Sequence, residues 1–184
     1  MLATRRRFTR AEYYRMVEVG ILGKRDQVEL IKGEIVEKFP MSLRHRAFVM
    51  NLSQPLIVRL DGRARVSVGT AVALADDTDT EPDLAVLRLR TPSFKVREPY
   101  AEDALLVIEV AGVSLAYDRT TKLRLYAEAG IPEYWIVDCD TETVEVYREP
   151  TGDAYHDVSR VSGAATVSPR GFPDVELTLA EIFA

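Results

Sequence analysis

The sequence predicts a single α/β domain, built around a mixed sheet that is flanked by helices. A continuous apolar run over residues 104–110 is typical of a central strand that is buried on both faces. A helical pattern over 115–129 follows it and stops at Gly130, and two strand-like segments, 134–138 and 143–147, come next. Because strands and helices alternate here, we expect them to pack in layers around one core.

Length and composition agree with one domain over residues 1–184, with its core over about 42–148. The chain has 184 residues, of which 47% are apolar and 29% charged, a balance that does not indicate disorder. Cys139 is the single cysteine, so no intrachain disulfide can form, which suits a reducing compartment. No signal core follows the basic residues 1–7, and no apolar run has membrane-spanning length. We therefore expect a cytoplasmic protein with no membrane contact.

A helix and a β-hairpin are expected near the N-terminus. Thr9 and Glu12 have the spacing of a capping box, which predicts a helix over 9–19. Apolar and polar side chains alternate over 28–37 on both sides of Lys32-Gly33, a dipeptide suited to a tight turn.

The next expected element is a helix over about 42–60. Ser42 is suited to cap its start, whereas Pro55 is expected to kink the helix or to end its first half. Four apolar side chains share one face of this helix: Phe48, Leu52, Leu56 and Leu60.

Two strands, over about 65–74 and 82–89, are expected to enclose an acidic loop. A stretch rich in Pro, Ser, Thr and Glu, 90–103, is expected to form a surface connection to the central strand. The C-terminal tail is expected to add short strand-like pieces and a last helical turn at 179–183.

The charges are distributed unevenly along the chain. The net charge of −5 argues weakly against nucleic-acid binding. Arginines gather in two segments, Arg5, Arg6, Arg7 and Arg10 in the first and Arg44, Arg46, Arg59, Arg63 and Arg65 in the second. Acidic side chains concentrate over residues 76–83 instead. This pattern is explained either by a solvated surface or by a basic rim that holds a phosphodiester beside an acidic pocket.

Asp83 and Glu109 are acidic residues beside or within apolar strands. Burying a lone carboxylate costs on the order of several kcal/mol, so each one needs a compensating partner. If segments 82–88 and 104–110 pair antiparallel, the start of the first lies opposite the end of the second, and both carboxylates can share one divalent cation. Mg²⁺ suits such a pair because it needs few protein carboxylates and keeps several waters.

Lys122 is expected on or beside the helix face that covers the sheet. It shares a stripe with Tyr126 and Ala129 at i, i+4 and i+7. A lysine on this face needs an anion, and two carboxylates, a metal-bound water or a phosphate would all serve. Arg119 and Arg124, by contrast, are expected to face solvent.

The order of Pro82-Asp83, Glu109 and a downstream lysine resembles the PD-(D/E)XK nuclease superfamily, which has the restriction-endonuclease-like fold. More narrowly, the chain resembles the Uma-type family of restriction-endonuclease domains from about residue 8 to its C-terminus. The segments that carry this resemblance are 29–35, 81–86, 107–110, Tyr117-Asp118-Arg119 with Lys122, and 126–138. The last of them is the most specific, since Pro-Asp occurs by chance in many chains.

The chain departs from the family pattern in two places. The superfamily motif places lysine two residues after the glutamate, where Ala111 stands, so the resemblance implies that Lys122 on the helix takes its place. The turn Ala111-Gly112-Val113-Ser114 also replaces a more polar, serine-rich turn, which leaves Ser114 available as a helix cap.

The resemblance implies a set of site residues. Asp83 and Glu109 would bind Mg²⁺, or Mn²⁺ as a substitute, with the backbone carbonyl of Val110 and the side chain of Glu29 as further ligands. Lys122 would position or deprotonate the attacking water, or neutralise the phosphate. His45, near the start of its helix, would contact the phosphate or assist a proton transfer.

Each of these residues also has a structural explanation. Asp83 and Glu109 can lie at solvated strand ends, and Lys122 can extend to the surface. Glu29 can be an exposed hairpin residue. His45 can be a surface residue or a helix cap. Other residues are expected to be mainly structural: Asp118 as a cap or brace of the helix, Asp138 in a turn, Cys139 as a small apolar residue, and Tyr126, Tyr134 and Trp135 as core aromatics.

We therefore expect a Mg²⁺-dependent nuclease that hydrolyses DNA phosphodiester bonds with a metal-activated water. The alternative is a noncatalytic nucleic-acid-binding or assembly module that keeps the fold, and the pI of about 5.2 and the altered turn leave it open. A homodimer would suit the cutting of both strands. The sequence indicates no recognition sequence and does not decide between DNA and RNA or between endo and exo cleavage. Two histidines and one cysteine are too few for a typical zinc site.

Overall fold

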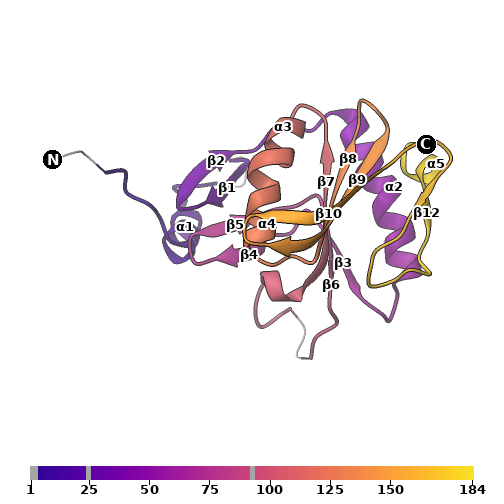
Figure 1. The fold of residues 1–184 in the computed structure, drawn as a ribbon. Helices are drawn as coiled ribbons and strands as arrows, with labels where there is room; N and C mark the ends of the chain where they lie inside the picture. Colours follow the sequence, from indigo (N-terminus) through magenta and orange to yellow (C-terminus); the bar gives the residue numbers. More distant parts are fainter. Residues whose placement is uncertain (1–3, 24–25, 92–93) are drawn as a thin grey trace.

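Six strands form a mixed sheet at the centre of the molecule (Figure 1). The structure is a computed structural model that describes residues 4–23, 26–91 and 94–184. In spatial order the strands are β10 (Ala154–Val161), β9 (Thr143–Thr151), β8 (Glu133–Asp138), β7 (Ala104–Ala111), β6 (Leu84–Leu87) and β3 (Arg65–Val68). β7 pairs antiparallel with β6 and parallel with β8, which makes the sheet mixed, as expected.

A second sheet of four strands lies to one side, beside the N-terminal helix α1 (Arg10–Glu18). Its strands, in spatial order, are β2 (Glu34–Glu37), β1 (Val28–Ile31), β5 (Thr78–Thr80) and β4 (Val72–Ala75). The expected capping box of α1 and the expected hairpin of β1 and β2 are confirmed. Gly33, at φ 77°, completes the hairpin turn where an added Cβ would lie 2.5 Å from the Cβ of Arg7.

Helices cover both faces of the central sheet. On one face lies α2 (Leu43–Arg59), with the short β11 (Thr166–Val167), β12 (Leu177–Thr178) and α5 (Leu179–Ile182) beside it. On the other face lies the βαβ crossover from β7 to β8, which consists of α3 (Leu115–Tyr117), the π-helical η2 (Asp118–Lys122) and α4 (Leu123–Glu128). A short 3₁₀ helix, η1 (Ala101–Asp103), precedes β7.

The alternation of side chains along β7 decides what faces each layer. Ile108 and Val110 point into the apolar core under α2, whereas Val107 and Ala111 point into the core under α4. Glu109 therefore points toward α4. Because Glu109 lies on the face of the sheet that the crossover helices cover, it is next to the helix residues described below.

The expected strand over 65–74 is wrong in one respect, because it is two strands in two different sheets. β3 pairs with β6 in the central sheet, and after Gly69, which has a positive φ of 54°, β4 pairs with β5 in the second sheet. The expected acidic loop also contains a buried strand, β5. Its Asp79 accepts a hydrogen bond from the buried Arg10 of α1, 3.0 Å away, which compensates its charge.

Three other expectations need correction or completion. α2 continues through Pro55 without interruption, because Leu52 and Leu56 on both sides of it are packed against the sheet. The tail contains a long strand, β10, that pairs with β9, rather than short pieces alone. The connection 90–103 contains residues 92 and 93, which lie outside the described residues, as do residues 1–3 of the basic N-terminal stretch.

None of the helices in the described part of the chain combines the length and the apolar character that crossing a bilayer requires.

Candidate functional site

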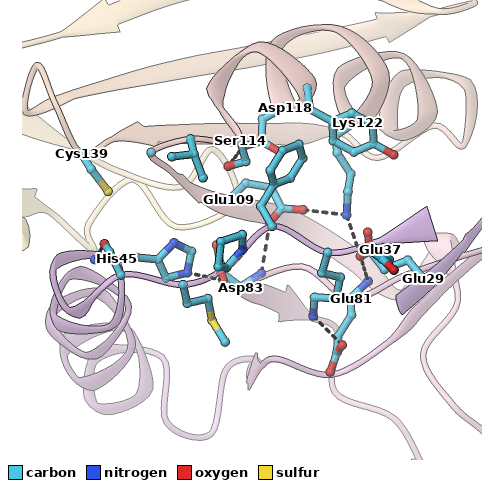
Figure 2. A pocket seen from close by; sticks show the side chains of 18 of the residues that line it. Glu29, Glu37, His45, Glu81, Asp83, Glu109, Ser114, Asp118, Lys122 and Cys139 are labelled. Atoms are coloured by element: carbon cyan, nitrogen blue, oxygen red, sulfur yellow. Dashed lines mark hydrogen bonds and ion pairs between the residues drawn. The ribbon is translucent and has the colours of Figure 1, made fainter. Parts of the chain in front are cut away.

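A cavity of about 290 Å³ opens at the end of the central sheet, where β6 begins and β7 ends. Figure 2 shows its lining, to which the second sheet, the start of α2 and the crossover helices all contribute. The structure brings all five side chains of the sequence-based site into this lining: Glu29, His45, Asp83, Glu109 and Lys122. These residues come from five separate parts of the chain.

The antiparallel register of β6 and β7 places Asp83 beside Glu109. Leu84 is paired with Ile108, so the residue before β6 lies opposite the residue that follows Ile108 in β7, as expected. The Asp83 N–H donates to Glu109 Oε2 at 3.4 Å, and the Val110 N–H donates to Asp83 Oδ2 at 2.8 Å. Two carboxylates and the Val110 backbone therefore converge at one strand end, although the Val110 side chain lies in the core under α2.

Lys122 is buried rather than extended to the surface, with 4% of its area exposed. Its Nζ lies 2.7 Å from Glu29 Oε1 and 3.3 Å from Glu109 Oε1. Tyr126, one helical turn further along the stripe, donates its hydroxyl to the same Glu109 oxygen at 2.7 Å. Lys122 thus connects the N-terminal hairpin to the central strand inside the cavity.

Burial and charge act in opposite directions on these groups. Burial is the largest influence on Glu109 and raises the pKa of its carboxyl to about 8, although Lys122 opposes this shift. Burial disfavours the charged Lys122 ammonium, but Glu109 and Glu29 outweigh it, so the pKa of Lys122 is raised and the group stays protonated at neutral pH. The cavity thus holds more carboxylate than one ammonium neutralises, which favours either a bound proton or a bound cation.

His45 reaches Asp83 from the first turn of α2. Ser42 caps this helix by accepting a hydrogen bond from the His45 backbone N–H at 3.1 Å, as expected for its N-cap. The His45 Nε2 atom then lies 2.8 Å from Asp83 Oδ1. With Val110 on its other oxygen, Asp83 is held from both sides.

Asp118 is a buried carboxyl that the sequence indicated mainly as a cap or brace of the helix. Its Oδ2 atom accepts a hydrogen bond from the Ser114 hydroxyl at 2.6 Å. The Ser114 side chain therefore binds Asp118 and makes no capping hydrogen bond to the backbone of α3. Burial, the largest influence, raises the pKa of Asp118 to about 6, whereas the Ser114 hydrogen bond and Lys122 oppose the shift. Asp118 also lines the cavity, so it adds a further titratable group near Lys122.

Sequence reasoning missed the contacts that hold Glu29 and Glu109 in place. Tyr126 was expected only in the core, yet its hydroxyl also donates a hydrogen bond to Glu109. Its position four residues after Lys122, on the same helix face, could have indicated this contact. The backbone N–H of Glu81 donates to Glu29 at 2.6 Å, and Lys38 pairs with the Glu81 carboxylate at 2.6 Å. These contacts join segments far apart in the chain, so no local sequence pattern predicted them.

The remaining residues have structural roles. Tyr134, Trp135 and Cys139 are buried, as expected, and Asp138 accepts backbone hydrogen bonds in the turn after β8, as expected. The expectation that Arg119 faces solvent is wrong, because it binds Glu145 on β9 through two nitrogens and thereby ties the crossover helix to the sheet.

Ion pairs within the chain account for much of the basic charge. Arg10 is buried against Asp79, and Arg63 binds both carboxylate oxygens of Asp174 at 2.7 and 2.8 Å. Among the described lining residues of the cavity, Arg44 is the one member of the two arginine segments, and it pairs with a glutamate in the β8–β9 turn. A solvated, paired surface therefore explains this charge better than a basic rim does.

The donor set fits a hard divalent cation. Asp83, Glu109 and the Val110 carbonyl supply oxygen atoms, which Mg²⁺ and Mn²⁺ prefer. Within the described ranges, no three histidine, cysteine or acidic side chains lie close enough together to form a complete metal cage. Mg²⁺ usually takes only one or two protein carboxylates and keeps waters and substrate oxygens, so a pair of carboxylates suffices.

The chain is similar to one protein family and to a solved structure. Residues 10–180 match the model of the Uma2 family, whose description reads "Putative restriction endonuclease". The crystal structure of a protein described as a "putative nuclease belonging to DUF820", from Anabaena variabilis ATCC 29413, matches 90% of this chain and 95% of that chain, with a TM-score of 0.71 and 22% identity. That likeness confirms the expected fold. No curated protein is significantly similar to the chain.

Proposed function

The chain belongs to the Uma2 family, and on that premise we propose that it is a Mg²⁺-dependent nuclease of the PD-(D/E)XK type that hydrolyses DNA phosphodiester bonds. The family description supports a nuclease with a nucleic-acid substrate. The observation that carries the finer proposal is the convergence of Asp83, Glu109 and the buried Lys122 in one cavity.

Asp83, Glu109 and the Val110 carbonyl would hold the cation. Glu29 is a further ligand, directly or through water, although its Oε1 atom already accepts from Lys122 and from the Glu81 backbone. When bound, Mg²⁺, or Mn²⁺ in its place, supplies an acidified water and stabilises the charge that grows on the phosphate.

Lys122 acts as a donor in this proposal. Because the pKa of its ammonium is raised, Lys122 keeps its proton at neutral pH and is poorly suited to take one from water. Its N–H groups are suited to orient the attacking water and to neutralise the phosphate, since both expose lone pairs. Of the roles that the sequence left open for Lys122, the raised pKa favours positioning and charge neutralisation.

His45 and Tyr126 position the two carboxylates. His45 holds one oxygen of Asp83, and Tyr126 holds one oxygen of Glu109, so both carboxylates keep a fixed orientation before substrate arrives. His45 also lines the cavity, where its ring can meet a phosphate.

Cleavage of single-stranded and double-stranded DNA in Mg²⁺ or Mn²⁺ tests the proposal. We expect Asp83→Asn, Glu109→Gln and Lys122→Gln each to lose roughly 10²–10⁴-fold in rate. Lys38→Gln is the matched control, because Lys38 lines the same cavity but pairs with Glu81 outside the carboxylate cluster. Variants that cleave as fast as the parent protein would show that the site is wrongly assigned.

A noncatalytic nucleic-acid-binding module is the second candidate. The observation that favours it is the Lys122 ammonium, which lies between Glu29 and Glu109 and already compensates part of their charge. Mn²⁺ titration separates the two candidates. Binding that is lost in Asp83→Asn supports the nuclease, whereas DNA binding without any Mn²⁺ binding supports the module.

A further inference from the structure

We propose that the outer face of α2 is a self-association surface, on which a second copy of this chain docks with its own α2 in the antiparallel direction. This inference is independent of the proposed chemistry, because it rests on residues outside the carboxylate cluster. It assigns a partner to an exposed apolar surface.

The contacts of α2 divide the helix into three faces. Phe48, Leu52 and Leu56 pack on the central sheet. A second face meets the C-terminal segment, where Asn51 donates to the Ile182 carbonyl and Arg59 pairs with a glutamate of α5. The third face points outward and is covered by neither of these layers.

This outer face is largely apolar. Leu43 is 84% exposed, Met50 68%, Ile57 50% and Val58 69%, and Ala47 lies exposed between the first two. Single exposed apolar residues are ordinary, but a contiguous row of them on one helix marks an interaction site. Such a row stays in water only at a cost that a partner would remove.

The spacing of the row identifies the kind of partner. Leu43, Ala47, Met50, Gln54 and Ile57, which we call the α2 seam, follow one another at intervals of four, three, four and three residues. This alternation is the heptad pattern by which one helix packs along another. The side of α2 that packs on the sheet instead repeats every four residues, so the two faces serve different neighbours.

The charges at the two ends favour an antiparallel pair of identical helices. The exposed Arg46 lies near the start of α2, and the exposed Asp61 follows its end. When two copies run in opposite directions, Arg46 of each helix approaches Asp61 of the other, and the helix dipoles also oppose each other favourably. A self-complementary contact of this kind closes as a two-fold dimer.

Pairing would fix the relation between two cavities. The first turn of α2 carries Ser42 and His45 into the lining of the cavity, and the 17-residue helix is about 25 Å long. In an antiparallel pair the two cavities therefore lie toward opposite ends of the paired helices.

Sedimentation velocity tests the surface. We expect the wild type to be dimeric at roughly 10–100 µM and Met50→Glu and Ile57→Glu to dissociate at least tenfold more readily, because each places a charge in the seam. Val158→Glu, on β10 and 56% exposed, is the matched control and should remain dimeric. Equal thermal midpoints would show that the exposed substitutions leave the fold intact.

Two outcomes overturn the self-association surface. One is a monomeric wild type across this concentration range, including the case in which Met50→Glu abolishes oligonucleotide binding and so assigns the seam to nucleic acid. The other is a dimer that neither seam variant weakens.

Cross-linking tests the direction of the pair. Gln54 is the seam residue midway between Arg46 and Asp61, so Gln54→Cys should cross-link to its counterpart across the two-fold axis. Leu43→Cys should not, because antiparallel pairing separates the two copies by most of the helix length. The native Cys139 is 3% exposed and should not react. Self-cross-linking of Leu43→Cys, or its absence from Gln54→Cys in a dimer, would refute the antiparallel arrangement.

Discussion

The Lys122 ammonium lies 2.7 Å from Glu29 Oε1, across 93 positions of sequence. This ion pair joins the crossover helices to the N-terminal hairpin and closes one side of the cavity. Since both side chains are buried, the pair links the stability of the second sheet to the carboxylate cluster on the central sheet.

Lys122→Met should destabilise the protein at neutral pH by about 3–5 kcal/mol, because removal of one partner leaves buried carboxylates uncompensated. Urea unfolding followed by circular dichroism measures this loss. The double variant Lys122→Met, Glu29→Gln should recover part of the stability but none of the cleavage activity. A Lys122→Met protein as stable as the wild type would mean that Lys122 is solvated in solution.

Tyr126→Phe should weaken Mn²⁺ binding several-fold and lower stability by about 1–3 kcal/mol, because Glu109 loses the hydroxyl that orients it. Tyr134→Phe is the control, since its equally buried hydroxyl donates to the Asp118 carbonyl instead. Calorimetric titration and urea unfolding of both variants separate positioning from packing. Equal effects on Mn²⁺ affinity would leave Tyr126 with a structural role alone.

Asp118→Asn should stabilise the folded protein at pH 7. Because burial raises the pKa of the folded Asp118 carboxyl to about 6, above its unfolded value, the folded state favours the protonated form. This preference benefits the wild type below pH about 4 and is lost as pH rises to about 6. The variant should therefore gain about 1–3 kcal/mol at pH 7 and nothing at pH 3.5. A difference that is constant across this range would contradict the assignment.

Mn²⁺ affinity should depend on pH through Glu109. Because burial raises the pKa of this carboxyl to about 8, a cation must displace its proton at lower pH. Affinity should rise about tenfold per pH unit up to pH about 8 and level off above it. Calorimetry in buffers of different ionisation enthalpy should detect close to one released proton per ion at pH 6.5. No proton release would show that Glu109 is already ionised before binding.

The sequence predicted the central part of the site because few contacts determine it. An apolar strand that carries Glu109 near its end and a second that begins after Asp83 leave few ways to pair, and antiparallel pairing brings the two acids together. Lys122 was identifiable because its helical stripe must cover the sheet. Local spacing therefore predicted that these three residues lie together, whereas the roles proposed for them came from the family resemblance.

The rest of the site depends on pairings that no local pattern specifies. Glu29 reaches Lys122 only because β1 joins β5 in a separate sheet. The polar strand β5 can be buried because Arg10 compensates the charge of Asp79. The same long-range pairing divides the segment 65–74 between two sheets. Charge compensation between distant residues overrode strand propensity in these places.

Mn²⁺ binding to the wild type, Asp83→Asn and Glu109→Gln, measured side by side at pH 8, tests the central claim most directly. Glu37→Gln is the control, because this glutamate lines the same cavity at the end of the hairpin. We expect one ion per chain in the wild type and in Glu37→Gln, and at least tenfold weaker binding in the other two variants. Equal affinity in all four proteins, or no binding in any of them, would contradict a cation held by Asp83 and Glu109.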